Sequence, residues 1–348
     1  MTQGAGAVPI HSHCYAYRSY ELFKQMFASQ DGSSIQLIKA GLGGTPSELG
    51  IVRYDRDVLK EGTVQPDIVI VEFAVNDAND ETEGNCYESL VLKALNANNQ
   101  PAVILLFSVF MNDWNLQDRL APVGRHYDLP MVSVKDAVVE QFRWTADQGK
   151  VISKKQFFYD IYHPTNTGHW VMADCLAWLF ADTDQAISDE EDISTDKWPI
   201  IGNDYKGIQL LDRLNSEGIA QIDAGGFRET DNDLHTANMD DHTYGTPQFP
   251  NNWMHTTESG LDRFKMTIRS KRLILVFKDS GDPGFGTANI WVDGKLVRQG
   301  DPHIANWTHC NAVVLYNEQD ANKHTVEIEM EVGHEDKRFT ILGFGYVL

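Results

Sequence analysis

Continuous apolar runs alternate with amphipathic segments through the N-terminal half of the chain, and this alternation restricts the fold more than any other feature. Four runs are rich in Val, Ile and Phe: 34–40 (SIQLIKA), 67–75 (DIVIVEFAV), 102–110 (AVILLFSVF) and 130–134 (PMVSV). Runs that are apolar at consecutive positions indicate strands covered on both faces, as in parallel sheets. The pattern therefore predicts βαβ units and an α/β fold.

The segments between and after these runs have the period of helices. They predict helices near 15–29, 48–60, 85–97, 115–127 and 135–147. A further helix follows Thr165 or Asn166, either of which can cap it, and continues through NTGHWVMADCLAWLF. Helices are therefore expected on both faces of the sheet.

The character of the chain changes at Ala181. The segment ADTDQAISDEEDISTDKW is acidic and too polar for a core, which is typical of a linker. Beyond it only strand-like runs follow, and Asp293-Gly294 is a typical hairpin turn. These runs are RFKMTI (263–268), RLILVFK (272–278), ANIWVDGKLV (288–297), NAVVLY (311–316), HTVEIEMEV (324–332) and RFTILGFGYVL (338–348). The sequence thus predicts an α/β domain at 1–182, a linker at 183–200 and an all-β sandwich at 201–348.

The charge of the chain limits its partners. A formal net charge of -21 at pH 7 repels phosphate backbones and anionic membranes, so neither nucleic acid nor a membrane is expected to bind. A neutral ligand is expected instead. No charged and apolar leader opens the chain, and the cysteines lack CxxC spacing, so we expect a cytoplasmic protein with reduced thiols. The cysteines are Cys14, Cys86, Cys175 and Cys310.

Three polar clusters lie where ligand sites form in α/β folds. Gly44 follows the first run, and its small size lets backbone N–H groups approach a ligand. Asn76 and Asp77 end the second run, where an amide can donate to an oxyanion. Asp160 and His163 precede the last helix, and the carboxylate can orient the imidazole as a general base. Each cluster alone also fits a structural role, as a turn or a helix cap.

Taken in order, these residues resemble a known family. Gly44, Asn76 in VND, and Asp160-x-x-His163 followed by Pro164 are similar to the motifs of SGNH hydrolases, also called GDSL-type esterases and lipases. The resemblance covers 1–182 and implies a flavodoxin-like, three-layer α/β/α domain. It implies that Gly44 N–H and the Asn76 amide form an oxyanion hole, and that Asp160 orients the base His163. Ala74 stands where the family usually has Gly.

The opening MTQGAGA is similar to the segment that follows the family's nucleophilic Ser. Met1 and Thr2 match the Ile-Thr after that Ser, so the resemblance implies a nucleophile directly before Met1, none within the chain, and a missing first strand. Ser12 and Ser19 lie in or before the next helix and carry little weight. Three explanations stay open: a start assigned at an internal Met, which we favour, a swapped arrangement in which 339–348 fills the gap, or a degenerate domain that only binds.

Histidines and aromatic residues elsewhere have plainer interpretations. His11, His13 and His169 are expected to be packing or surface residues. In the β domain, five aromatic residues can stack on sugars, although core positions are the commoner use of such residues. They are Tyr244, Trp253, Phe285, Trp291 and Trp307.

The two-domain arrangement is similar to carbohydrate acetyl esterases with a jelly-roll partner domain. It implies a serine esterase that removes acetyl or another short acyl group from an oligosaccharide or small-molecule ester, with no cofactor and no metal. The alternatives are a carbohydrate-binding protein with a degenerate hydrolase domain and a GDSL-type lipase. The sugar, the acyl group and the oligomeric state are left open.

Overall fold

The computed structural model describes residues 5–29, 34–186, 193–234 and 249–348, which form two compact units. Within these ranges the first unit contains 5–43 and 62–203, and the second contains 44–61 together with everything after 203. Two segments therefore group differently from the predicted boundaries. Residues 44–61 belong to the second unit. Residues 193–203, which the prediction divides between the linker and the start of the β sandwich, belong to the first.

A parallel sheet forms the centre of the first unit. Its strands β1 (Ile68–Val71), β2 (Ala102–Phe107) and β3 (Met131–Ser133) lie in that order, with Val71 opposite Leu105 and Leu105 opposite Met131. Every residue of β2 after Ala102 is buried, which is why its sequence is apolar at consecutive positions. The predicted parallel sheet is confirmed.

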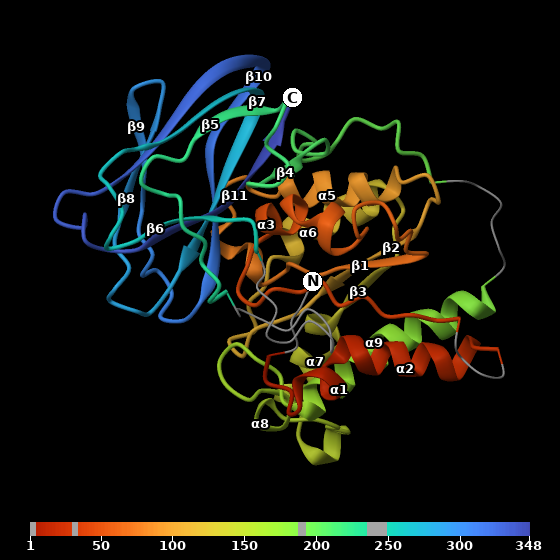
Figure 1. Cartoon of the computed structure of the whole chain (residues 1–348). Helices are drawn as coiled ribbons and strands as arrows, with labels where there is room; N and C mark the ends of the chain where they lie inside the picture. Colours follow the sequence, from red (N-terminus) through yellow and green to blue (C-terminus); the bar gives the residue numbers. More distant parts are fainter. Residues whose placement is uncertain (1–4, 30–33, 187–192, 235–248) are drawn as a thin grey trace. The chain divides into compact units, whose positions relative to one another are not determined.

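Helices cover both faces of this sheet (Figure 1). The helices α2 and α9 lie alongside each other on one face, where they share a core with Ile104 and Leu106. On the opposite face Leu105 contacts α6 at Gly124, where a Cβ would lie 3.0 Å from a Leu105 methyl. The helices of this unit are α1 (Ile10–His13), α2 (Tyr15–Phe27), α5 (Asn85–Leu95), α6 (Gln117–His126), α7 (Val134–Arg143), α8 (Lys154–Phe157) and α9 (Asn166–Gln185). The predicted three-layer α/β/α architecture is confirmed.

The predicted strand at 34–40 is wrong, because these residues form neither strand nor helix. A strand exists through hydrogen bonds to a neighbouring strand. In the part of the chain that the structure describes, the sheet ends at β1 on one side and β3 on the other, and no strand pairs with 34–40. An apolar composition alone does not provide that neighbour.

The second unit is an antiparallel β structure. Its main path runs β4-β11-β7-β10-β8-β9, while β5 pairs with β7 and β6 pairs with β11. The strands are β4 (Gln209–Leu211), β5 (Ala220–Asp223), β6 (Trp253–His255), β7 (Phe264–Asp279), β8 (Ala288–Val292), β9 (Lys295–Gly300), β10 (His309–Met330) and β11 (Phe339–Val347). Two short helices, α3 (Ser47–Val52) and α4 (Tyr54–Asp57), replace the single helix predicted at 48–60.

Two long strands, β7 and β10, pair with each other in the middle of this sheet. On its other edge, the first half of β7 pairs with β5 and its second half pairs with β11. The sequence predicted separate strands for the two halves of β7 and of β10. In β10 the pairing register shifts between Asn317 and Asn322, where the two predicted runs are joined. The hairpin turn at Asp293-Gly294 is confirmed, with φ of 49° and 78° and the flanking strands β8 and β9 paired.

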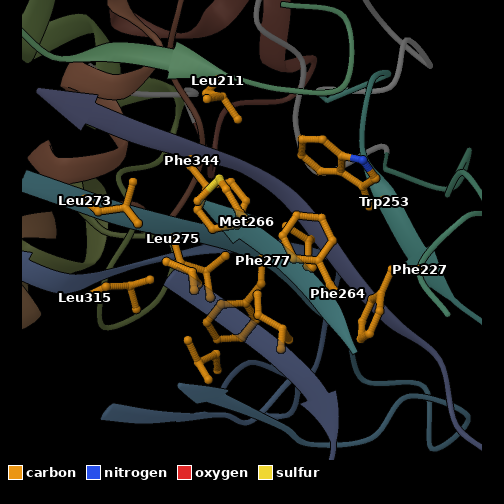
Figure 2. Packing of buried hydrophobic residues seen from close by; sticks show 14 of the residues in the cluster. Leu211, Phe227, Trp253, Phe264, Met266, Leu273, Leu275, Phe277, Leu315 and Phe344 are labelled. Atoms are coloured by element: carbon orange, nitrogen blue, oxygen red, sulfur yellow. The ribbon is translucent and has the colours of Figure 1, made fainter. Parts of the chain in front are cut away.

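The strands of the second unit pack around an apolar core (Figure 2). Trp253 packs edge-on against Phe264 at 5.4 Å, and Phe264 stacks on Phe344 at 5.9 Å, which joins residues from three strands. Both halves of β7 contribute, through Met266 and Leu275 among others. Trp253 is therefore a core residue, as the commoner interpretation of its sequence position held.

Candidate functional site

Asp160 and His163 form a hydrogen-bonded pair in the loop before α9. The imidazole Nδ1 lies 2.9 Å from Oδ2 of Asp160 and 3.1 Å from Oδ1. The backbone N–H groups of Tyr162 and His163 also donate to Oδ1, at 2.7 and 2.8 Å. The loop thus closes on the carboxylate, and a spacing of three residues suffices to bring the two side chains together.

The partner of Nδ1 fixes the chemistry of the other ring nitrogen. An ionised carboxylate only accepts hydrogen bonds, so Nδ1 carries the proton and Nε2 keeps its lone pair. The His163 side chain is 44% exposed, which leaves it accessible to a reactant. The pair therefore has the arrangement of a general base with an orienting acid.

Hydrogen bonds keep the Asp160 carboxylate ionised. Desolvation by burial would raise the pKa of Asp160, but hydrogen bonds from the His163 ring and from the N–H groups of Tyr162 and His163 outweigh it, so the pKa is lowered. A carboxylate that accepts several N–H groups is stabilised in its charged form. Asp160 consequently stays charged over the pH range in which an imidazole acts as a base.

The N-terminal turn is fastened to this same loop. Asn166 bonds the Val8 backbone twice, since its Oδ1 accepts from Val8 N–H at 2.8 Å and its Nδ2 donates to Val8 C=O at 2.9 Å. Gly6 has φ of 90° and lies against the Pro164 carbonyl, where a side chain would collide. Only Gly readily combines that φ with so close a contact. We name residues 5–9 with these contacts the N-terminal latch.

His169 completes the N-terminal latch from the first turns of α9. Its Nδ1 accepts the Tyr15 N–H at 3.2 Å, and its Nε2 donates to the Ala5 carbonyl at 3.1 Å. The side chain is buried, which confirms the expected packing role. No local sequence pattern indicates these hydrogen bonds, because both partners lie more than 150 residues away along the chain.

Asn76 begins a short 3-10 turn, Asn76–Asn79, after β1. The turn starts where the Asp77 N–H bonds the Phe73 carbonyl at 3.0 Å, and Asn76 itself is half-buried. Ala74, which stands at the family's Gly position, is fully buried and accepts a bond from Leu116 N–H at 2.8 Å. Asn76 thus follows the carboxyl end of a strand, as predicted, and its oxyanion role stays a prediction.

Gly44 is the first residue of the segment 44–61 and belongs to the second unit. Its φ of 65° is left-handed, and its carbonyl accepts a 3.0 Å hydrogen bond from Nε2 of His309. A Cβ at this position would lie 3.3 Å from the Trp307 ring. The histidine holds the peptide in place, and the role of Gly44 as an oxyanion donor stays a prediction.

The two serines weighed as nucleophiles have other surroundings. Ser12 bonds the neighbouring His13 at 2.9 Å, and Ser19 is buried within α2. Among the described residues no serine hydroxyl is hydrogen-bonded to His163. The segment MTQGAGA itself lies partly outside the described residues, which begin at Ala5.

Of the β-domain aromatic residues named above, Trp253 and Phe285 are interior and Trp291 is half-buried. Phe285 is 3% exposed beneath the Arg338 guanidinium, and the Trp291 indole donates to Glu329 at 2.9 Å. Trp307 is 43% exposed, whereas Tyr244 lies outside the described residues. Among the four of these residues that the structure describes, Trp307 is therefore the most exposed.

Within the described ranges, no group of three or more His, Cys, Asp or Glu side chains is placed to hold a metal ion. None of the described helices is both long and apolar enough to cross a membrane. All four cysteines are free thiols.

Comparison with known proteins gives a match in structure. No family model and no curated protein matches the sequence. Among solved structures, the chain is similar to a two-domain esterase (CEX) active on acetylated mannans, with 24% identity and a TM-score of 0.81. That alignment covers 99% of this chain and 89% of the esterase. A structure of that esterase co-crystallized with mannopentaose matches with 24% identity and a TM-score of 0.77, over 99% of this chain and 88% of the other. Over almost its whole length, the chain has the fold of a two-domain esterase.

Proposed function

We propose that this chain is a serine esterase of the SGNH type that removes acetyl or another short acyl group from a carbohydrate. The observation that carries the proposal is the Asp160–His163 pair. Nδ1 of His163 lies 2.9 Å from Oδ2 of Asp160, so Nε2 is the ring nitrogen that can accept a proton. The shared fold with an esterase active on acetylated mannans supports the substrate class. The net charge of -21 supports it too, because acetylated neutral glycans carry no charge to be repelled.

The reaction follows from the protonation states of the pair. A serine hydroxyl attacks the ester carbonyl while its proton passes to Nε2 of His163, and the negative oxygen that forms is stabilised by amide donors, for which Gly44 and Asn76 are the candidates. Nε2 then gives that proton to the departing sugar hydroxyl, and the acyl group stays on the serine. Water attacks this acyl-enzyme with the same base, which releases the acid and restores the serine.

Asp160 has two roles in this sequence. It keeps the proton on Nδ1 before the reaction, and its charge stabilises the imidazolium that forms when Nε2 takes up a proton. The serine is the one reacting group that the described residues do not supply. Its place directly before Met1 stays a prediction from the resemblance.

The test compares the chain as printed with a form that also carries the residues encoded before Met1. Acetate release from acetylated mannan oligosaccharides and hydrolysis of p-nitrophenyl acetate are measured for both. We expect the longer form to hydrolyse both substrates, and His163→Ala and Asp160→Asn each to lower kcat by at least about a thousandfold. His126→Ala is the matched control, since it removes an imidazole from another part of the same unit and should leave the rates unchanged.

An inert longer form, or a rate unaffected by His163→Ala, would refute the proposal. Binding of oligosaccharides without turnover would instead support a non-catalytic carbohydrate-binding protein. A preference for long acyl chains over acetate would support a lipase.

A further inference from the structure

Three aromatic rings form a contiguous row in the loops at the carboxyl edge of the first unit's sheet. Phe110 stacks on Trp114, with ring centroids 5.7 Å apart and planes 22° apart. Tyr162 meets the same Phe110 edge-on at 5.2 Å. We call Phe110, Trp114 and Tyr162 the aromatic platform.

The aromatic platform adjoins the general base. The Tyr162 ring lies 6.1 Å from the imidazole of His163, so the row of rings runs from the base through Phe110 to Trp114. The two loops are also joined through their backbones, because Met111 N–H donates to the Ile161 carbonyl at 3.1 Å. Phe110 and Trp114 follow β2 at its carboxyl end, which is where parallel sheets place their ligand sites.

Charged side chains fix the turn that carries Trp114. Nζ of Lys154 lies 2.7 Å from Asp113 and donates to the Met111 carbonyl at 2.8 Å. Across the turn, Phe110 N–H donates to the Trp114 carbonyl at 3.0 Å. The ring of Trp114 is therefore held in place before any ligand binds, which lowers the entropy lost on binding.

Much of this aromatic surface faces solvent. Trp114 is 37% exposed and Tyr162 is 53% exposed, together with Tyr159 and Ile161 of the same loop. Contiguous exposed apolar surface of this kind marks ligand or partner sites. The four side chains offer roughly 400–500 Å², whereas a stable protein interface needs about 800 Å² from each partner. The patch suits a small ligand better than a second protein.

We propose that the aromatic platform is a subsite for neutral pyranosyl residues, which stack on Trp114 and Tyr162 while a neighbouring part of the glycan reaches His163. The apolar C–H face of a pyranose ring matches an aromatic face. An uncharged sugar also meets no repulsion from a chain of net charge -21. The inference rests on the proposed function, because it assumes that the bound sugar carries the ester. Binding of the sugar itself can be measured without turnover.

The experiment is a calorimetric titration of the chain as printed with mannopentaose, cellopentaose and xylopentaose. We expect at least one of them to bind, and Trp114→Ala to weaken that binding about fivefold or more. Trp114→Phe keeps a ring in place and should restore most of the affinity. Trp198→Ala is the matched control, because it removes a tryptophan that is 91% exposed in the same unit and should not change the affinity.

Equal affinity for the unmodified chain and Trp114→Ala, or no binding of any of the three sugars, would overturn the proposal. A change of oligomeric state in Trp114→Ala, seen by sedimentation while sugar binding is unchanged, would overturn it in favour of a protein interface. Thermal unfolding of each variant identifies any that fails to fold. Tyr162→Ala, which removes the other exposed ring of the aromatic platform, then takes the place of Trp114→Ala and should also weaken the binding. Trp114-dependent binding, together with a longer form that hydrolyses no ester, would refute the proposed function but support the subsite.

Discussion

The imidazole of His169 is held in its neutral form inside the first unit. Desolvation by burial lowers its pKa to about 4, and the charges of Arg18 and His163 act in the same direction. The hydrogen bond to the Ala5 carbonyl opposes this shift but does not cancel it. Protonating the ring would also end its bond from Tyr15 N–H, because Nδ1 would no longer accept.

This lowered pKa makes the stability of the protein depend on pH. Between pH 6.5 and about 4 the unfolded chain binds a proton at His169 that the folded chain does not, so the free energy of unfolding falls as the pH is lowered through that window. Above pH 6.5 the contribution is constant. We expect a loss of roughly 3 kcal/mol over the window from this residue.

The measurement is chemical denaturation of the unmodified chain and of His169→Gln at a series of pH values. The glutamine variant should be less stable near neutral pH and should show a weaker fall in stability between pH 6.5 and 4. His126→Gln serves as the control for other histidines. If both chains lose stability in parallel over that window, His169 is not a buried neutral group.

At the scale of single residues, the sequence revealed the site in part. Asp160 and His163 were predicted because three residues of loop bring them together, and the structure shows them bonded. His169 and Asn166 take part in contacts with a segment more than 150 residues away, which no local pattern indicates. Such partners depend on the tertiary fold.

At the scale of elements, the N-terminal latch ties the turn before α2 to the beginning of α9. Thr165 caps α9 by accepting the Gly168 N–H at 3.1 Å, which leaves Asn166 at the first helical position with its amide directed to Val8. If the nucleophile precedes Met1, this latch fastens the chain that follows the nucleophile to the loop that carries the base. Asn166 would then be a positioning residue.

Replacing Asn166 by Ala should loosen the N-terminal latch. Two hydrogen bonds are lost, so we expect the free energy of unfolding to fall by about 1–2 kcal/mol and hydrogen exchange at the Val8 amide to become about tenfold faster. In the longer, active form kcat should fall while KM changes little, because the geometry of the reacting groups is disturbed and substrate contacts are not. Hydrogen exchange by NMR and steady-state kinetics measure these effects.

Asn98→Ala, at an exposed site in the same unit, is the control for this variant. Restored protection and kcat in Asn166→Gln would support the hydrogen bonds as the cause. Unchanged exchange at Val8 in Asn166→Ala would contradict the latch.

Helices were easier to predict than strands for a physical reason. A helix forms its backbone hydrogen bonds within one segment, so the helical spacing of apolar residues in 15–29 and 85–97 was enough to predict helices there. The structure has α2 and α5 in these ranges. A strand depends on a neighbour, so 34–40 stayed irregular although its composition suits a strand. For the same reason the separate runs predicted within β7 and β10 form continuous strands, because β7 and β10 pair with each other and β7 also pairs with β11.

At the scale of the whole molecule, the division into an α/β unit and an antiparallel β unit was predictable from the sequence. It was not predictable that residues 44–61 belong to the second unit. This segment joins the second unit through contacts such as the Arg56 guanidinium over the Phe249 ring at 4.4 Å and Val52 against Gly345. Gly44, a predicted oxyanion donor, is thereby held by His309 of the β strands. The β unit thus fixes the backbone at one residue to which the family resemblance assigns a catalytic role.

In the proposed mechanism, His163 activates a serine that is transiently acylated. To test this, the longer form of the chain is mixed with an acetylated mannan oligosaccharide, quenched in acid within the first turnovers, digested and mapped by mass spectrometry. We expect one acetyl ester, on the serine directly before Met1, which is absent in His163→Ala. Acetyl on another residue, acetyl that persists in His163→Ala, or substrate turnover without any acyl-enzyme would contradict it.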